Sequence, residues 1–137
     1  MNKNDVISKM KSLSLPEGSY VVFGSGPMAA LGIREVNDID LYVSTEVLEE
    51  LKQKGWKQIH KGPRDEPLTL DVYEAHDHWE FSPYSPTLKD LLSRAFVVDG
   101  VTFASIEDVR KSKESRSGPK HMADVKLIDN YIGKQKN

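Results

Sequence analysis

The sequence predicts an α/β protein in which helices flank a mixed sheet. Apolar runs over residues 19–23 and 38–43 indicate buried strands, and segments with helical spacing separate and follow them. Later in the chain, Asp99-Gly100 is a strong signal for a two-residue hairpin turn. Strands that alternate with helices favour parallel pairing, whereas a hairpin requires antiparallel pairing. The sheet should therefore contain both kinds of neighbour.

Bulk properties bound the classes of function. With 137 residues, the chain is expected to be one domain with a substantial core. Its formal net charge of −2 gives no general electrostatic attraction to nucleic acid, and 38% hydrophobic residues fit a globular protein. The absence of cysteine excludes a disulfide framework, a zinc–thiolate site and a cysteine nucleophile. Residues 1–10 lack an apolar signal core and no run approaches a membrane span, so a cytoplasmic location is the default expectation.

The elements expected in the first half of the chain have recognisable boundary signals. Ser25 could cap a short helix that has Pro27 in its first turn. Ser44 or Thr45 could cap the next helix, which Gly55 would end. In order, the expected elements are a helix over 3–13 with apolar residues at helical spacing, a strand over 19–23, a helix over 26–31, a strand over 38–43 and a helix over about 45–54.

The second half begins with extended segments. Residues 56–60 are expected to form a strand, and a polar loop leads to another strand over 68–73, which carries Asp71. Residues 74–86 contain two prolines and little periodicity, so we predict a loop that is long enough to matter functionally.

Helices with clear start signals follow that loop. Thr87 with Asp90, and Ser105 with Asp108, have the spacing of capping interactions at helix N-termini. In order, the expected elements are a helix from 87 to about 94, a hairpin over 95–103, a helix from 105 to about 114, and a helix that begins at Pro119 and stops at Gly133.

Asp38 and Asp40 are the most informative residues of the chain. They alternate with Ile39 and Leu41 on a predicted strand, so both carboxylates should point to the same face. Adjacent carboxylates repel each other, and a hard divalent cation such as Mg²⁺ would offset that repulsion. Asp71 is likewise flanked by apolar residues on a predicted strand. Three carboxylates from neighbouring strands could hold two Mg²⁺ ions, which is the usual apparatus for in-line phosphoryl transfer.

The Gly24-Ser25-Gly26 turn precedes this pair at a strand-to-helix junction. Its backbone N–H groups and its hydroxyl could bind a phosphate, since helix N-termini attract anions and glycine permits close approach. The alternative is that Ser25 only caps the helix. Together with the aspartates, the turn indicates a phosphate site beside a metal site.

Three further signals are weaker. His76-Asp77-His78 could be a transition-metal cluster, although loop histidines usually have no such role. Trp79, Phe81 and Tyr84 could stack on a base or an acceptor, or could pack the loop against the core. The basic run over 110–116 could be an ordinary solvated helix face, or it could steer a triphosphate.

These motifs and their spacing resemble the nucleotidyltransferase superfamily of the DNA polymerase β type. In both, Gly-Ser is followed after about a dozen residues by Asp-x-Asp and later by an apolar-Asp-apolar strand. Residues 105–124 resemble the C-terminal part of small members, including AbiEii toxin-like proteins and antibiotic nucleotidyltransferases, with the pattern Leu-Glu-Asp-Leu, a lysine, then Pro-Lys-Asp-x-x-Asp. Ile106-Glu107-Asp108-Val109 and Lys113 fit, and 119–124 fits except that His121 stands where the family has an acid. The resemblance covers about residues 18–132.

The resemblance implies a polymerase-β-like core and roles for particular residues. It makes Asp38, Asp40 and Asp71 the catalytic metal ligands, with Asp71 as the best candidate to accept the proton of the acceptor hydroxyl. The nucleotide-binding set that it implies is Gly24, Ser25, Arg34, Lys113 and Lys120. Asp124 could orient a lysine of this set through an ion pair, or could only decorate its helix.

The implied activity is magnesium-dependent transfer of a nucleoside monophosphate from an NTP, with ATP as the expected nucleotide, to a hydroxyl acceptor, with release of pyrophosphate. Two Mg²⁺ ions are expected, with Mn²⁺ as a substitute. A small-molecule acceptor is favoured over RNA or protein, and a homodimer or a partner subunit could complete the acceptor site. The alternatives are a non-catalytic nucleotide-binding module of the same fold and a toxin-type enzyme that modifies RNA or protein.

Overall fold

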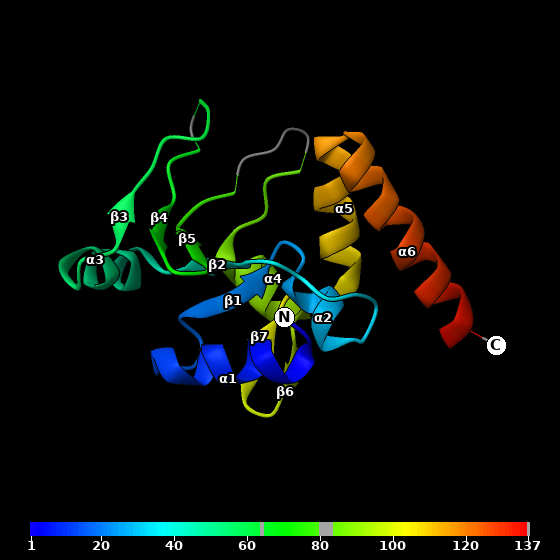
Figure 1. Ribbon diagram of the computed structural model, residues 1–137, viewed down its shortest axis with the longest axis horizontal. Coiled ribbons are helices and arrows are strands. Elements are labelled where there is room, and N and C mark those ends of the chain that lie inside the picture. The colour runs from blue at the N-terminus through cyan, green and yellow to red at the C-terminus, as the bar shows by residue number, and fades with distance from the viewer. Residues whose placement is uncertain (64, 80–83, 137) are drawn as a thin grey trace.

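The computed structural model describes residues 1–63, 65–79 and 84–136. In that part of the chain, helices surround a seven-stranded sheet with the strand order β3-β4-β5-β2-β1-β7-β6 (Figure 1). The strands are β1 (Tyr20–Phe23), β2 (Ile39–Val43), β3 (Lys57–Gln58), β4 (Leu68–Leu70), β5 (Tyr73–His76), β6 (Phe96–Val98) and β7 (Val101–Phe103). The helices are α1 (Lys3–Leu13), α2 (Gly26–Ala30), α3 (Thr45–Gln53), α4 (Leu88–Arg94), α5 (Ile106–Arg116) and α6 (Pro119–Gln135).

Strand pairing confirms the predicted mixed sheet. β2 is antiparallel to β1 and parallel to β5, and β1 is parallel to β7. The hairpins β4–β5 and β6–β7 add antiparallel pairs, and in the second hairpin Asp99 and Gly100 have φ values of 50° and 82°, as a two-residue turn requires. Because β2 has hydrogen-bonded neighbours on both sides, its side chains are held on a rigid part of the sheet.

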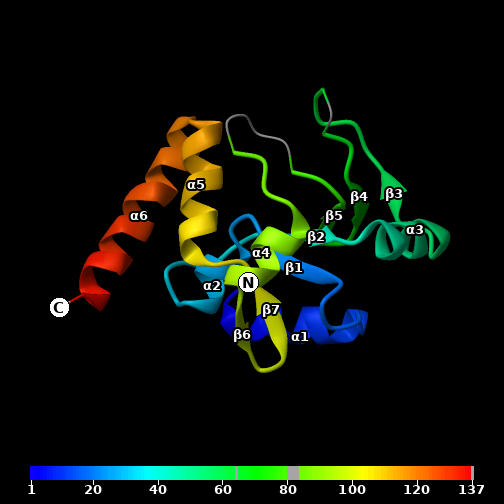
Figure 2. The ribbon, with the colours of Figure 1, turned by 180° about the vertical axis from the view of Figure 1, so that it is seen from behind.

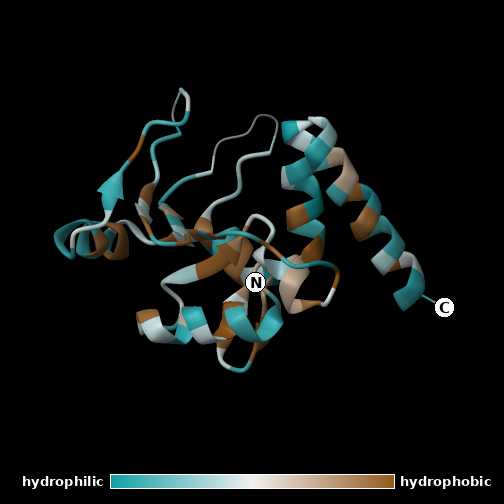
Figure 3. Cartoon of the chain, viewed as in Figure 1, coloured by the Kyte–Doolittle hydropathy of each residue, from teal (hydrophilic) through white to brown (hydrophobic). Residues whose placement is uncertain are grey.

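The helices cover both faces of the sheet. Along β1, Val22 belongs to a core cluster with α1 and α3, whereas Val21 and Phe23 belong to a cluster with α4, α5 and α6, because successive side chains of a strand alternate between faces. α5 and α6 pack side by side at one end of the sheet, as both views show (Figures 1 and 2). Apolar residues gather in the central strands, whereas much of α6 and the outer loops are hydrophilic (Figure 3).

Side-chain caps start three helices where the sequence predicts them. Ser44, Thr87 and Ser105 each accept a hydrogen bond from a backbone N–H in the first turn of the helix that follows. Ser25 stands at the N-cap position of α2, as the sequence predicts, but its side chain makes no capping hydrogen bond. α6 continues past Gly133 to Gln135. None of the described helices has the length and apolar character that a membrane crossing needs.

The strand expected over 68–73 is wrong in its second half. β4 ends at Leu70, Asp71 lies in a turn with a φ of 53°, and β5 begins at Tyr73. Aspartate tolerates this left-handed conformation better than most residues, because its short side chain can bond locally. The loop predicted over 74–86 accordingly starts too early, since its first three residues belong to β5, and residues 80–83 lie outside the described part. The strand predicted over 56–60 is only the two-residue β3.

Candidate active site

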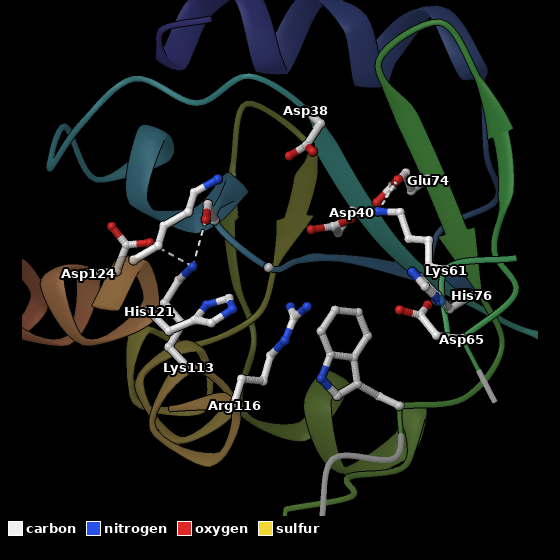
Figure 4. A pocket seen from close by; sticks show the side chains of 14 residues that line it. Asp38, Asp40, Lys61, Asp65, Glu74, His76, Lys113, Arg116, His121 and Asp124 are labelled. Atoms are coloured by element: carbon white, nitrogen blue, oxygen red, sulfur yellow. Dashed lines mark hydrogen bonds and ion pairs between the residues drawn. The ribbon is translucent and has the colours of Figure 1, made fainter. Parts of the chain in front are cut away.

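A cavity of about 240 Å³ opens between the sheet and the C-terminal helix pair (Figure 4). Its sheet side carries carboxylates from β2 and β5, and its helix side carries basic groups from α5 and α6. The lining residues are Gly24, Ser25, Asp38, Asp40, Lys61, Asp65, Glu74, His76, Trp79, Lys113, Arg116, Lys120, His121 and Asp124.

Asp40 and Glu74 are register partners on β2 and β5, so their carboxyl groups leave neighbouring strands together. Burial raises the pKa of Asp40 well above its usual range, and the hydrogen bond with Glu74 and the charge of Asp38 raise it further. Asp38 precedes β2 and lines the same cavity. The structure thus brings both aspartates of the Asp-x-Asp motif to one place.

Glu74 forms an ion pair with Lys61, in which Oε1 of Glu74 lies 2.5 Å from Nζ of Lys61. Burial acts to raise the pKa of Glu74, but the hydrogen bonds with Asp40 and Lys61 outweigh it, so this pKa lies below its usual value. The two pKa values shift in opposite directions, so Asp40 is the member of the pair that binds a proton more readily. A divalent cation would supply the positive charge that allows both groups to ionise.

His76 follows Glu74 on β5 and joins the two carboxyl groups. Asp40, Glu74 and His76 each offer one ligand atom, and these atoms lie within 4.8 Å of one another. Burial lowers the pKa of His76 to about 4, so its ring is neutral at physiological pH. His78 instead contacts Asp77, with 3.0 Å between Nδ1 and Oδ1, so the His76-Asp77-His78 run does not form one cluster.

Gly24 makes room for Asp40. It has a φ of 57°, and an added Cβ would lie 2.9 Å from Cγ of Asp40 and closer still to its carboxylate. β1 ends at Phe23, the register partner of Asp40. A glycine is therefore required here both by backbone conformation and by close approach to a side chain.

A buried ion-pair network joins the turn after β1 to the C-terminal helices. Nζ of Lys113 donates to Oγ of Ser25 at 2.7 Å and lies 2.8 Å from Asp124, and Lys113 and Asp124 are only 6% and 5% exposed. Arg34 donates to both carboxylate oxygens of Asp124 at 2.8 Å and to Oγ of Ser25 at 3.0 Å. Asp124 thus holds two cations and does not merely decorate its helix. Burial lowers the pKa of Lys113, the charge of Arg34 adds to this, and Asp124 opposes it.

Arg116, Lys120 and His121 complete the basic side of the cavity. Nδ1 of His121 is buried and has no hydrogen-bond partner in the described part of the chain. Burial lowers the pKa of His121, and the charges of Arg116 and Lys113 lower it further. A buried ring nitrogen without a partner costs stability.

Asp71 does not lie at this cavity, which corrects the sequence prediction. It is exposed in the turn between β4 and β5, and its carboxylate lies 2.8 Å from Nζ of Lys9 on α1, beside a separate open groove. Glu74, the register partner of Asp40, lines the cavity instead. Residues 70–72 and 73–75 share the same apolar-acid-apolar pattern, and only the pairing of the second segment with β2 distinguishes them.

Sequence reasoning also missed other residues of the cavity. His76 had a signal in the run of histidines, but the predicted strand ended before it. Lys61 and Asp65 lie in a polar loop whose composition gives no such signal. Arg116 was part of the basic run over 110–116, and the structure places it in the cavity wall.

The aromatic residues of the predicted loop pack against the core. Trp79 contacts Phe23 with 4.6 Å between ring centroids and is 4% exposed. The hydroxyl of Tyr84 bonds to the buried carboxylate of Asp108. Packing therefore accounts for both rings, although Trp79 also lines the cavity. Phe81 lies outside the described residues.

The sequence matches no protein-family model and no curated protein. Two solved structures of ANT(2″)-Ia, an aminoglycoside nucleotidyltransferase, are similar to this one. The crystal structure in complex with adenylyl-2″-tobramycin has a TM-score of 0.56 and 17% identity, over 96% of this chain and 87% of that chain. The solution structure of the same antibiotic-resistance factor has a TM-score of 0.57 and 15% identity, over 97% and 83%. At these identities the likeness concerns the fold alone: this chain shares the fold of the ANT(2″)-Ia structures, which agrees with the mixed α/β architecture that its sequence predicts.

Proposed function

We propose that the protein is a divalent-metal-dependent nucleotidyltransferase, which moves a nucleoside monophosphate from an NTP to a hydroxyl acceptor and releases pyrophosphate. The observation that carries this proposal is that carboxyl groups and basic groups line one cavity. Asp40 and Glu74 are register partners on neighbouring strands, and Asp38 lines the cavity with them. Lys113 and Ser25 line the same cavity. Such a cavity has the two charge types that a metal-bound triphosphate requires.

Asp38, Asp40 and Glu74 would hold the metal ions. Their fit to a hard cation rests on geometry and burial. Asp40 and Glu74 are register partners, Asp38 lines the same cavity, and burial together with the neighbouring carboxyl groups raises the pKa of Asp40. A bound Mg²⁺ would stabilise charge on the transferred phosphoryl group and lower the pKa of the acceptor hydroxyl. Glu74 replaces Asp71 as the best candidate to accept the hydroxyl proton, because it is ionised and reaches the cavity.

The basic side of the cavity would bind the triphosphate. Lys113 and the hydroxyl of Ser25 lie within 2.7 Å of each other, and both line the cavity. Lys120 and the ring of His121, both on α6, line this side of the cavity and would add donors. Arg34 does not line the cavity, and it would act indirectly by holding Ser25 and Asp124.

A small acceptor with amino groups suits this cavity. Asp65 adds an acidic group to the lining beside the metal-binding carboxylates, and this group would attract a cationic molecule and repel RNA. ANT(2″)-Ia was solved with an adenylylated aminoglycoside, and compounds of that class are the first acceptors to test here.

The proposal is tested by incubating the protein with each α-labelled NTP, Mg²⁺ and either an aminoglycoside panel or a cell extract. Wild type should label an acceptor and release pyrophosphate. Glu74→Gln should lower turnover by about two orders of magnitude or more, as loss of an electrostatic catalytic group does. Asp71→Asn is the matched control and should retain activity, since Asp71 pairs with Lys9 outside the cavity. Absence of labelling by a protein that binds Mg-NTP would favour a non-catalytic nucleotide-binding module.

A further inference from the structure

We propose that His76 is a ligand of the divalent ion held by Asp40 and Glu74, so that this site favours first-row transition ions over Mg²⁺. The inference concerns the site of the proposed function, and the role of the ion in catalysis rests on that proposed function. Its structural basis is separate, since it concerns which atoms bind the ion.

The position of His76 follows from strand geometry. Glu74 and His76 are two residues apart on β5, so both side chains leave the same face of the sheet. Their register partners on β2 are Asp40 and Tyr42, which places Asp40 beside Glu74. One ligand atom from each of Asp40, Glu74 and His76 lies within 4.8 Å of the other two, and this spacing allows one ion to contact all three.

The ring of His76 is also held in place. Its centroid lies 5.2 Å from that of Trp79, with an interplanar angle of 69°. Trp79 is itself anchored, because its Nε1 donates to Oγ of Ser112 on α5 at 3.2 Å and its ring packs on Phe23. His76 is therefore part of a packed wall of the cavity, and Figure 4 shows it beside Lys61 and Asp65.

The donor set determines which ions the site prefers. Mg²⁺ binds oxygen ligands in a strict octahedron, whereas imidazole nitrogen suits Zn²⁺ and neighbouring transition ions. In the first-row series Mn²⁺ binds most weakly, and Zn²⁺ binds more tightly than Mn²⁺. An imidazole beside two carboxylates adds binding energy for those ions and little for Mg²⁺. The ion must also displace Nζ of Lys61 from Glu74, which weakens the binding of every ion to a similar degree.

Calorimetry on the full-length, metal-free protein tests the proposal with Mg²⁺, Mn²⁺ and Zn²⁺ as separate probes. His76→Ala should weaken Zn²⁺ binding by at least about tenfold, Mn²⁺ binding by less, and Mg²⁺ binding hardly at all. His78→Ala is the matched control, because His78 contacts Asp77 instead, and it should change none of the three. Equal losses for all three ions in His76→Ala, or no loss for any, would overturn the proposal.

Pulsed electron paramagnetic resonance of bound Mn²⁺ gives an independent readout. Wild type should show nitrogen modulation from a coordinated imidazole, and His76→Gln should lose it while still binding Mn²⁺ through the carboxylates. Modulation that persists in His76→Gln, or that is absent in wild type, would overturn the proposal. Neither measurement needs turnover, so a protein that labels no acceptor would contradict the proposed function and leave the assignment of His76 standing.

Discussion

Glu74 on β5 lies opposite Asp40 on β2 in the register of two parallel strands, and their carboxyl groups share a hydrogen bond. The pair lies across the cavity from Lys113. Asp40 belongs to the Asp-x-Asp motif, whereas no sequence motif indicated Glu74.

Metal binding should depend on Asp40 and not on Asp71. Mg²⁺ at about 100 times its Kd should raise the free energy of unfolding of wild type by about 2.7 kcal/mol, because the ion binds only the folded state. Asp40→Asn should lose most of this gain, since it replaces a charged carboxylate ligand with a neutral amide of similar size. Asp71→Asn should keep it, because Asp71 is exposed and pairs with Lys9. Thermal melts with and without Mg²⁺ measure the gain, and similar losses in both variants would contradict the site.

Replacement of Gly24 should damage the site more than backbone strain explains. Gly24→Ala places a Cβ against the carboxylate of Asp40 at a φ of 57°. Gly32→Ala is a matched control, since Gly32 has a φ of 72° but open space where its Cβ would be. Each should lose roughly 1 kcal/mol from left-handed strain, and Gly24→Ala should lose more and bind Mg²⁺ weakly. Urea unfolding gives the free energy of unfolding of both variants. Equal losses would mean that the side chain of Asp40 moves away from the new Cβ without destabilising the protein.

Lys113 should contribute to binding of the phosphates and not of the nucleoside. Lys113→Met should weaken ATP binding by about 1.5–3 kcal/mol, the usual range for a hydrogen bond to a charged group, and should leave adenosine binding almost unchanged. Lys111→Met changes an exposed lysine two residues away on α5 and should alter neither. Titration with a fluorescent nucleotide, and competition by ATP and adenosine, give both affinities. A parallel loss of ATP and adenosine binding in Lys113→Met would point to a damaged fold.

Acid should destabilise the protein through Asp108. Burial acts to raise the pKa of this carboxyl, but hydrogen bonds from Arg94, Tyr84 and Ser105 outweigh it and hold the pKa below the usual value of 3.8. The folded-state pKa is thus lower than the unfolded-state one, so the stabilisation is complete above the unfolded-state pKa and is lost as the pH falls through the folded-state pKa. Urea midpoints between about pH 6 and about pH 2 should fall less steeply for Asp108→Asn than for wild type.

A surface pair provides the control for this pH effect. Asp129 pairs with Arg110 at 2.6 Å, but its side chain is half exposed, so solvent screens the interaction. Asp129→Asn should therefore leave the acid limb of the stability curve close to that of wild type. If both variants flatten it equally, the buried position of Asp108 is not the cause.

His121 should lower the stability of the protein and raise its affinity for ATP. His121→Leu removes a buried nitrogen that has no partner in the described part of the chain, so it should be neutral or slightly stabilising in urea. The same change should weaken ATP binding, because it removes a donor from the phosphate side of the cavity. His121→Asn keeps a polar atom near the place of Nδ1 and should retain most of the affinity. Equal ATP affinity in the leucine and asparagine variants would exclude a direct contact.

The sequence by itself determined the local features of this protein. Caps at Ser44, Thr87 and Ser105 and the Asp99-Gly100 turn depend on residues at most a few positions apart, and all of them occur in the structure. Asp38 and Asp40 are two positions apart at the start of β2, and both line the cavity, as their spacing predicts. The mixed sheet also followed from the order of these elements.

Only the tertiary structure decided which distant residues meet. Asp71 and Glu74 have similar neighbours in sequence, and the choice between them depends on where β4 turns and how β5 pairs with β2. The contact of Lys113 with Ser25 spans 88 positions of the chain. It forms because α5 packs at the end of the sheet, near the turn between β1 and α2 that contains Ser25. Strand register and helix docking are set by the burial of side chains from many segments at once, and no local pattern of residues contains that information.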